Sequence, residues 1–139
     1  MPLQTYTGSC HCGSVRFEAD LDFSEGSNRC NCSYCAKARA WFAFAKGAQR
    51  FRLLDGSGAS EYRWTPPGQS ESHLTYTFCR TCGIRTFARG EVEHLGGTFH
   101  AIHIPTLELT PEERAKIPVR VLNGREGRYG ETPPGPDAI

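Results

Sequence analysis

The chain has 139 residues, of which 38% are hydrophobic; this is enough for one modest core and predicts a single domain. Sixteen Lys and Arg residues stand against 15 Asp and Glu residues spread along the chain, so nucleic acids and anionic membranes are not expected as partners. The N-terminus lacks the basic and apolar regions of a secretory signal, and no stretch approaches the ~18 apolar residues needed to span a bilayer. We therefore expect a soluble, cytoplasmic protein.

Seven cysteines in a chain without a secretory signal are expected as thiols rather than disulfides, because the cytosol keeps them reduced. Cysteines that only fill a core are not grouped at short, regular spacings, whereas metal ligands are. The spacing therefore favours metal binding over core packing. The three groups are Cys10 with Cys12, then Cys30, Cys32 and Cys35, and finally Cys79 with Cys82.

Residues 5–10 are predicted to form a short strand that leads into the first cysteine pair. If the segment stays extended, Cys10 and Cys12 project to the same side and both thiols can reach one ion, while His11 points to the opposite, solvent side. Gly13 follows at once and permits a positive φ, which would let the backbone fold around the sulfur atoms.

A second strand is predicted over residues 14–19, because apolar and polar residues alternate there. Val15, Phe17 and Ala19 are expected to face the core. Residues 22–28 are predicted to form a polar turn just before the cysteine triplet.

In the rest of the chain, short predicted strands alternate with turn residues, as in an all-β protein. One helix is predicted with Thr110 as its N-cap and Pro111 at its first position. A helical turn is also expected over residues 36–40, capped by Ser33. The resulting prediction is a mainly β domain over residues 1–125 and a Gly- and Pro-rich tail over 126–139. The remaining predicted strands cover residues 41–45, 51–54, 60–64, 73–78, 86–89, 99–104 and 119–122.

Residues 77–84 have the form of a zinc knuckle, in which a tight hairpin turn carries two metal-binding cysteines and is followed by glycine. A closed structural zinc site needs four protein ligands, whereas a reactive site keeps one position free. The two cysteine pairs together would supply the four ligands of a structural site, and the triplet would supply the three ligands of a reactive site. Zinc suits thiolate ligands, but ligand type alone also permits an iron–sulfur cluster, and other partitions of the seven thiols stay open.

Three motifs in this order resemble the CENP-V/GFA family, which includes the glutathione-dependent formaldehyde-activating enzymes. They are residues 8–17, residues 30–35 and residues 78–83, and the similarity extends over about residues 5–125, including the stretch 122–124. The resemblance implies a zinc-containing β-tent fold of short antiparallel sheets. It also implies two zinc ions, a structural one on Cys10, Cys12, Cys79 and Cys82 and a catalytic one on Cys30, Cys32 and Cys35.

For function, the resemblance implies a carbon–sulfur lyase that joins glutathione and formaldehyde into S-(hydroxymethyl)glutathione, a step in formaldehyde detoxification. Three thiolates already give a divalent ion a net negative charge and weaken it as a Lewis acid, so we favour activation of an incoming thiol over polarisation of the carbonyl. The alternative is a zinc-stabilised binding module or glutathione carrier that performs no chemistry. The sequence gives no prediction of the true thiol and aldehyde or of the oligomeric state.

Several further residues are weaker candidates. His100 and His103 are three apart on one predicted strand and face opposite ways, which leaves His103 open as a fourth ligand, a proton shuttle or an ordinary histidine. Tyr34, Trp41 and Phe42 adjoin the triplet and suit either a pocket or the core, with the core favoured. Four basic residues near the cysteine motifs are candidates for the glutathione carboxylates, although solvated surface charge is the default for each: Arg29, Lys37, Arg39 and Arg85.

Overall fold

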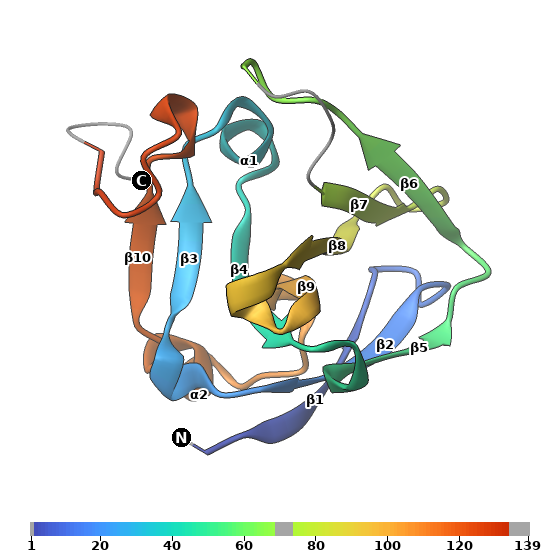
Figure 1. Cartoon of the computed structure of the whole chain (residues 1–139). Helices are drawn as coiled ribbons and strands as arrows, with labels where there is room; N and C mark the ends of the chain where they lie inside the picture. Colours follow the sequence, from blue (N-terminus) through green and yellow to red (C-terminus); the bar gives the residue numbers. More distant parts are fainter. Residues whose placement is uncertain (1, 69–73, 134–139) are drawn as a thin grey trace.

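The computed structural model describes residues 2–68 and 74–133, so the predicted strand start at His73 and the end of the predicted tail, 134–139, lie outside the described residues. The protein is mainly β, as predicted, and its strands form two sheets (Figure 1). Of the helices in the described part of the chain, none has the length and apolar character needed to span a bilayer. The helices are α1 (Ser33–Ala38) and α2 (Pro111–Ala115).

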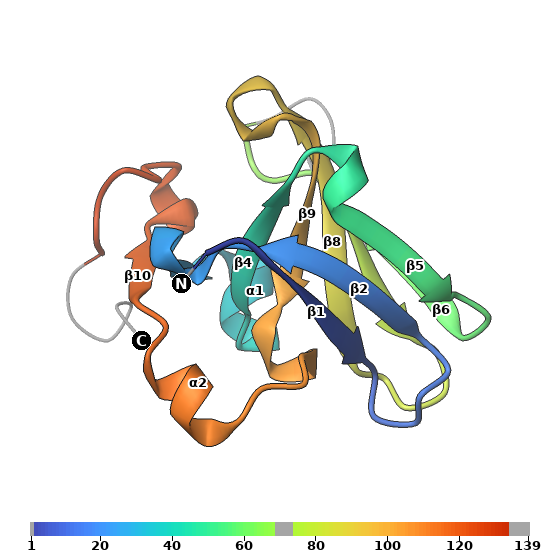
Figure 2. The same cartoon turned by 90° about the horizontal axis from the view of Figure 1, so that it is seen from below.

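The smaller sheet has the strand order β1-β2-β5 and the larger one the order β10-β3-β4-β9-β8-β7-β6. Neighbouring strands are antiparallel except β10 and β3, which are parallel. Figure 2 shows the smaller sheet crossing one face of the larger sheet at β4, β9 and β8. The strands are β1 (Gln4–Ser9), β2 (Arg16–Leu21), β3 (Ser27–Cys30), β4 (Trp41–Lys46), β5 (Phe51–Asp55), β6 (Ala59–Arg63), β7 (Leu74–Cys79), β8 (Arg85–Val92), β9 (Gly97–His103) and β10 (Val119–Leu122).

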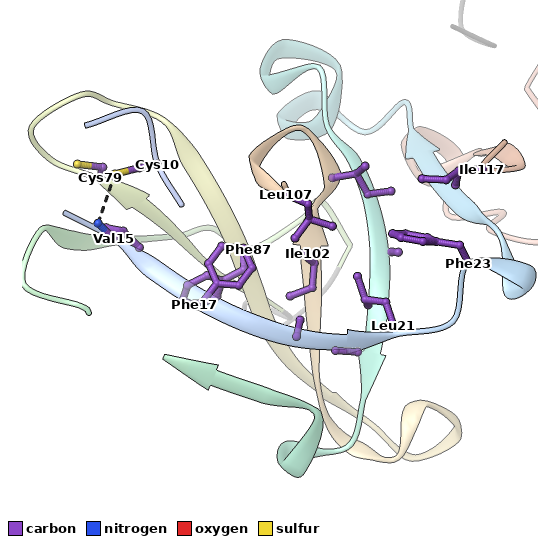
Figure 3. Packing of buried hydrophobic residues seen from close by; sticks show 14 residues of the cluster. Cys10, Val15, Phe17, Leu21, Phe23, Cys79, Phe87, Ile102, Leu107 and Ile117 are labelled. Atoms are coloured by element: carbon purple, nitrogen blue, oxygen red, sulfur yellow. Dashed lines mark hydrogen bonds between the residues drawn. The ribbon is translucent and has the colours of Figure 1, made fainter. Parts of the chain in front are cut away.

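The main core lies between the two sheets (Figure 3). The predicted alternation in the second strand is confirmed, since Val15, Phe17 and Ala19 are fully buried. They pack with residues of the larger sheet that include Phe87 and Ile102. Burial of this apolar surface is the main force that holds the sheets face to face.

The larger sheet buries side chains on its other face as well. Along β4, Ala43 and Ala45 belong to the main core, whereas Phe42, the residue before Ala43, belongs to a second apolar cluster with Tyr76 and Ala101. Successive residues of a strand point to opposite faces, so the same strands serve both clusters. The second cluster includes Cys30, Cys32 and Cys35, which places the predicted triplet on the face away from the smaller sheet.

Two local predictions need correction. The polar turn predicted for residues 22–28 is shorter, because a 3-10 turn at Phe23–Glu25 leads into β3 at Ser27. Ser27 and Asn28 are buried where β3 pairs with β10, and this partner lies about ninety residues away along the chain. The cap of α1 is Cys32 rather than Ser33: its sulfur accepts a hydrogen bond from the backbone N–H of Cys35.

The predicted start of α2 is confirmed. Thr110 caps the helix and Pro111 occupies its first position. The Thr110 hydroxyl accepts a bond from the Glu113 amide, and the Glu113 carboxylate accepts one from the Thr110 amide. This reciprocal capping box satisfies two backbone donors that a helix start leaves free.

Candidate metal centres

Four cysteines from the two sheets converge on one point. Cys10 and Cys12 follow β1, Cys79 ends β7, and Cys82 lies in the turn before β8. Their sulfur atoms all lie within 4.8 Å of one another. The Sγ–Sγ distances are 3.7 Å between Cys10 and Cys12 and 3.6 Å between Cys12 and Cys79. A tetrahedral zinc with Zn–S bonds of about 2.3 Å requires sulfur separations of about 3.8 Å, so the donor set fits this ion.

Backbone amides surround the buried sulfur atoms of this group. The Val15 amide donates to Cys10 Sγ at 3.3 Å (Figure 3), and the Thr81 and Cys82 amides both donate to Cys79 Sγ at 3.4 Å. Hydrogen bonds to sulfur favour its ionised form. Contact with the Ser14 hydroxyl, followed by the amides, lowers the pKa of Cys79 to about 5.

The local geometry around Cys10 and Cys12 differs from the extended segment that was predicted. The chain bends between β1 and β2, and Gly13 adopts a φ of +88°. Gly83 adopts a φ of +78° after the second cysteine pair. Both turns use a backbone conformation that side chains with a Cβ rarely adopt, which confirms the expected role of Gly13. His11 is exposed, as predicted.

The predicted triplet is also assembled. Cys30 ends β3, Cys32 caps α1, and Cys35 lies in the first turn of that helix. Their three sulfur atoms lie within 4.8 Å of one another. The Cys32 amide donates to Cys30 Sγ at 3.5 Å, and the Cys35 amide donates to Cys32 Sγ at 3.4 Å.

Each thiol of the triplet changes the pKa of its neighbours. Hydrogen bonds with the Cys30 and Cys35 thiols lower the pKa of Cys32 to about 2. The same two neighbours, Cys30 and Cys32, together with burial raise the pKa of Cys35 far above its ordinary value. Three thiolates at this spacing repel one another unless a positive charge lies between them. The triplet therefore fits a soft divalent ion bound by three sulfur atoms.

A segment after β10 is held against the triplet by two buried asparagines. Asn31 Nδ2 donates to Asn123 Oδ1 at 3.0 Å, and Asn31 Oδ1 accepts the Arg125 amide at 2.9 Å. A Cβ on Gly124 would collide with Cys30 Sγ. Only glycine at position 124 therefore allows the backbone to lie this close to the sulfur. Figure 1 shows this segment beside α1. The domain boundary at residue 125 stays a prediction.

Among the described residues, two cavities large enough for a small molecule have walls that include cysteines of the triplet. One of about 280 Å³ has a polar rim formed by the segment after β10. The other, of about 410 Å³, contacts all three cysteines and is otherwise mainly apolar. The smaller cavity is lined by Cys32, Ser33, Trp64, Pro66, Pro67 and residues 124–127 with Tyr129. The larger is lined by the triplet, Phe42, Phe44, Leu74, Tyr76, Arg85, Val92, His94, Leu95, Ala101, Leu122 and Tyr129.

The weaker candidates separate clearly. Within the described residues, His103 belongs to neither group of clustered ligand atoms. Phe42 lines the larger cavity, whereas Trp41 packs against the core and donates to Ser27 Oγ at 2.7 Å. The expectation that Arg85 is a solvated surface residue is wrong, because it is only 9% exposed.

Tyr129 lines both cavities and was not predicted as a site residue. It follows β10 in a Gly- and Pro-rich stretch, where no periodicity points to a structural role. The sequence has no signal for Tyr129, because its place beside the triplet depends on the path of the chain after β10.

Comparison with known proteins agrees with this geometry. The structure is similar to a crystal structure of a Rhodobacter sphaeroides protein, with a TM-score of 0.62 and 27% sequence identity over 81% of this chain and 98% of that one. Residues 5–119 match the family described as glutathione-dependent formaldehyde-activating enzyme, and both clusters of cysteines fall within the match. The chain therefore belongs to the family of glutathione-dependent formaldehyde-activating enzymes.

Proposed function

We propose that this protein is a zinc-dependent carbon–sulfur lyase that joins glutathione to an aldehyde, with formaldehyde as the substrate of the family type, and that it acts in the cytoplasm. The observation that carries the proposal is the triplet of Cys30, Cys32 and Cys35, which offers three sulfur ligands at the wall of a cavity of about 410 Å³. Three protein ligands beside a cavity are the arrangement of a catalytic zinc site, which leaves one position for a small molecule.

Each residue of the site has a part in this proposal. When bound to the triplet, zinc supplies a positive charge that lowers the pKa of an incoming thiol. Cys30, Cys32 and Cys35 hold that charge in place. The segment around Gly124 shields one side of the triplet, and the apolar side chains of the larger cavity keep water from the reacting carbon.

The proposed reaction is an addition to a carbonyl group. The sulfur of glutathione forms a bond to the carbonyl carbon, the π electron pair moves to the oxygen, and that oxygen takes up a proton equivalent to the one that the thiol released. The reverse reaction breaks the same carbon–sulfur bond. Orientation of the two reactants in adjoining cavities is the main contribution that the protein itself makes.

For the second group, we propose a structural zinc on Cys10, Cys12, Cys79 and Cys82. Its support is the set of four sulfur ligands at zinc-like separations and their position between the two sheets. A closed site of four thiolates leaves no position for substrate, and its binding free energy adds to the stability of a small domain.

The first test is the visible spectrum of the anaerobic, cobalt-substituted protein during titration with glutathione. We expect a change in the thiolate charge-transfer band, because the glutathione thiol enters the open position at the triplet. The control ligand is ophthalmate, in which a methyl group replaces the thiol, and it should leave the spectrum unchanged. Turnover of glutathione with formaldehyde is then followed by the loss of free thiol.

An inert spectrum would contradict the proposal and indicate two closed sites, as in a zinc-stabilised binding module. A spectral change that is specific to glutathione, without turnover of formaldehyde or any other aldehyde, would instead identify a glutathione carrier.

A further inference from the structure

The larger cavity beside the triplet is too large for formaldehyde alone. Its volume is about 410 Å³, roughly fourteen times the ~30 Å³ that one water molecule occupies in the liquid. Formaldehyde has only two non-hydrogen atoms and would leave most of this space unfilled. The walls include Phe42, Phe44 and Leu74 from the face of the larger sheet that points away from the smaller sheet, so the space suits an apolar group.

One cation lies in this apolar wall. Arg85 is 9% exposed, and its guanidinium lies 5.2 Å from the ring centre of Tyr34 and 5.1 Å from that of Tyr76. The two rings stack on each other with 3.9 Å between their centres, so the guanidinium lies beside the stacked pair. Its Nε and Nη1 are buried and have no hydrogen-bond partner in the described part of the protein.

No carboxylate of the described residues pairs with this cation. Among the described residues that line the cavity there is no Asp or Glu, and none of the ion pairs found in the described chain includes Arg85. A buried cation with unpaired donors is costly, and natural proteins keep such groups where a ligand supplies the partner. A carboxylate matches the flat, two-pronged edge of a guanidinium best.

We infer that the electrophile of this enzyme is an aldehyde or ketone with an apolar body that fills the larger cavity and a carboxylate that pairs with Arg85. The inference rests on the proposed addition of a thiol at the triplet. The smaller cavity, with its polar rim at residues 124–127, is left for the body of glutathione. Cys32 lines both cavities, so the two reactants meet at the triplet.

Binding of an unreactive probe separates this inference from catalysis. Benzoate and benzamide have nearly the same shape, but only benzoate carries a charge, and isothermal titration calorimetry on the zinc-loaded protein gives the affinity of each. We expect benzoate to bind about tenfold more tightly than benzamide, or more, because a charge-assisted bidentate pair forms with Arg85. Arg85→Met should remove this preference and leave benzamide binding within about twofold, whereas Arg85→Lys should keep part of it.

Arg89 provides the matched control, because it is exposed on the same strand and lines a separate cavity with His100. Arg89→Met should leave the preference for benzoate unchanged. Equal binding of benzoate and benzamide by the wild type would overturn the inference. So would an unaltered preference in Arg85→Met, since the carboxylate would then bind elsewhere, for example at the metal.

Turnover distinguishes failure of this inference from failure of the proposed function. With glutathione, we expect 4-carboxybenzaldehyde to have a higher kcat/KM than both benzaldehyde and formaldehyde, and Arg85→Met to abolish its advantage over benzaldehyde. Rapid turnover of formaldehyde alone, with no preference for benzoate, would keep the proposed function and overturn the inference. Arg85-dependent binding of benzoate without turnover of any aldehyde would overturn the proposed function and keep the anion site.

Discussion

His100 is a buried histidine that the proposed reaction does not use. Its side chain is 7% exposed, and its ring stacks on Phe51 with 4.0 Å between the ring centres. Nδ1 is buried and has no hydrogen-bond partner among the residues that the structure describes. Burial, with a smaller contribution from Arg89, lowers the pKa of His100 to about 4. The imidazole is therefore neutral at pH 7 and behaves as a flat apolar ring.

We predict that His100→Phe reduces the sensitivity of the fold to mild acid. The unfolded chain binds a proton at this histidine near pH 6.5, well above the pKa of about 4 in the fold. The stabilising contribution of the neutral ring is therefore present above pH 6.5 and is lost as the pH falls toward 4. Between pH 7 and 5.5 the wild type should lose about 1 kcal/mol more of its free energy of unfolding than the variant does. Urea unfolding of the zinc-loaded proteins at both pH values measures this, and identical losses would contradict it.

At the scale of elements, Arg52 links the central strand of the smaller sheet, β2, to its edge strand β5. It lies on β5, and its Nη1 and Nη2 each donate to one carboxylate oxygen of Asp20 on β2, at 2.9 Å and 2.7 Å. Its Nε donates to Glu18 at 2.8 Å. Hydrogen bonding to Arg52, helped by the Thr5 hydroxyl, lowers the pKa of Asp20 to about 2. The pair fixes the register of β2 and β5 across their exposed face.

A double-mutant cycle with Asp20→Asn and Arg52→Met should give a coupling free energy of about 1 kcal/mol, a value discounted for the exposure of Arg52 to solvent. The carboxylate contributes stability above its unfolded pKa of about 4, and this contribution disappears only as the pH falls toward 2. The coupling should therefore be equal at pH 6 and pH 8. Thermal and urea unfolding provide the measurement, with Glu61 and Arg63, an exposed pair 3.8 Å apart, as the control cycle. A coupling no larger than that of the control pair would argue against a role for Arg52 in holding the sheet.

For the whole molecule, the two groups of cysteines are placed so that their loss should have different consequences. Cys10 and Cys79 are buried at the junction of the two sheets, and their group joins segments almost seventy residues apart. The triplet instead lies on the outer face of the larger sheet, within β3 and α1, next to both cavities. A small domain depends strongly on a crosslink of the first kind.

We therefore predict that Cys79→Ser unfolds the domain, whereas Cys32→Ser keeps the fold and abolishes turnover of thiol adducts. Serine can still cap α1 at position 32, because its hydroxyl accepts the bond that the sulfur accepts from the Cys35 amide. Circular dichroism during heating reports the fold, and metal analysis should show the loss of one zinc per chain in Cys32→Ser. Equal collapse of both variants would show that the structural and catalytic roles are not divided in this way.

Features that depend on neighbouring residues could be predicted from the sequence. The short spacing of Cys30, Cys32 and Cys35 predicted that their sulfur atoms gather, the alternation of Val15, Phe17 and Ala19 predicted their burial, and Thr110 with Pro111 predicted the start of α2. Each of these depends on the period of a strand, the start of a helix or the reach of a short loop, all of which are local. The family resemblance rested on the same local motifs.

Features that arise between distant segments could be seen only once the chain was folded. β3 is a strand because β10 lies beside it, and nothing in the polar stretch before Cys30 indicates that pairing. Arg85 looked like a surface charge because arginine is usually solvated, yet it is buried beside Tyr34 of α1 and Tyr76 of β7. The cavities arise in the same way, since their walls come from strands, a helix and the segment after β10, whose proximity depends on the packing of the whole chain.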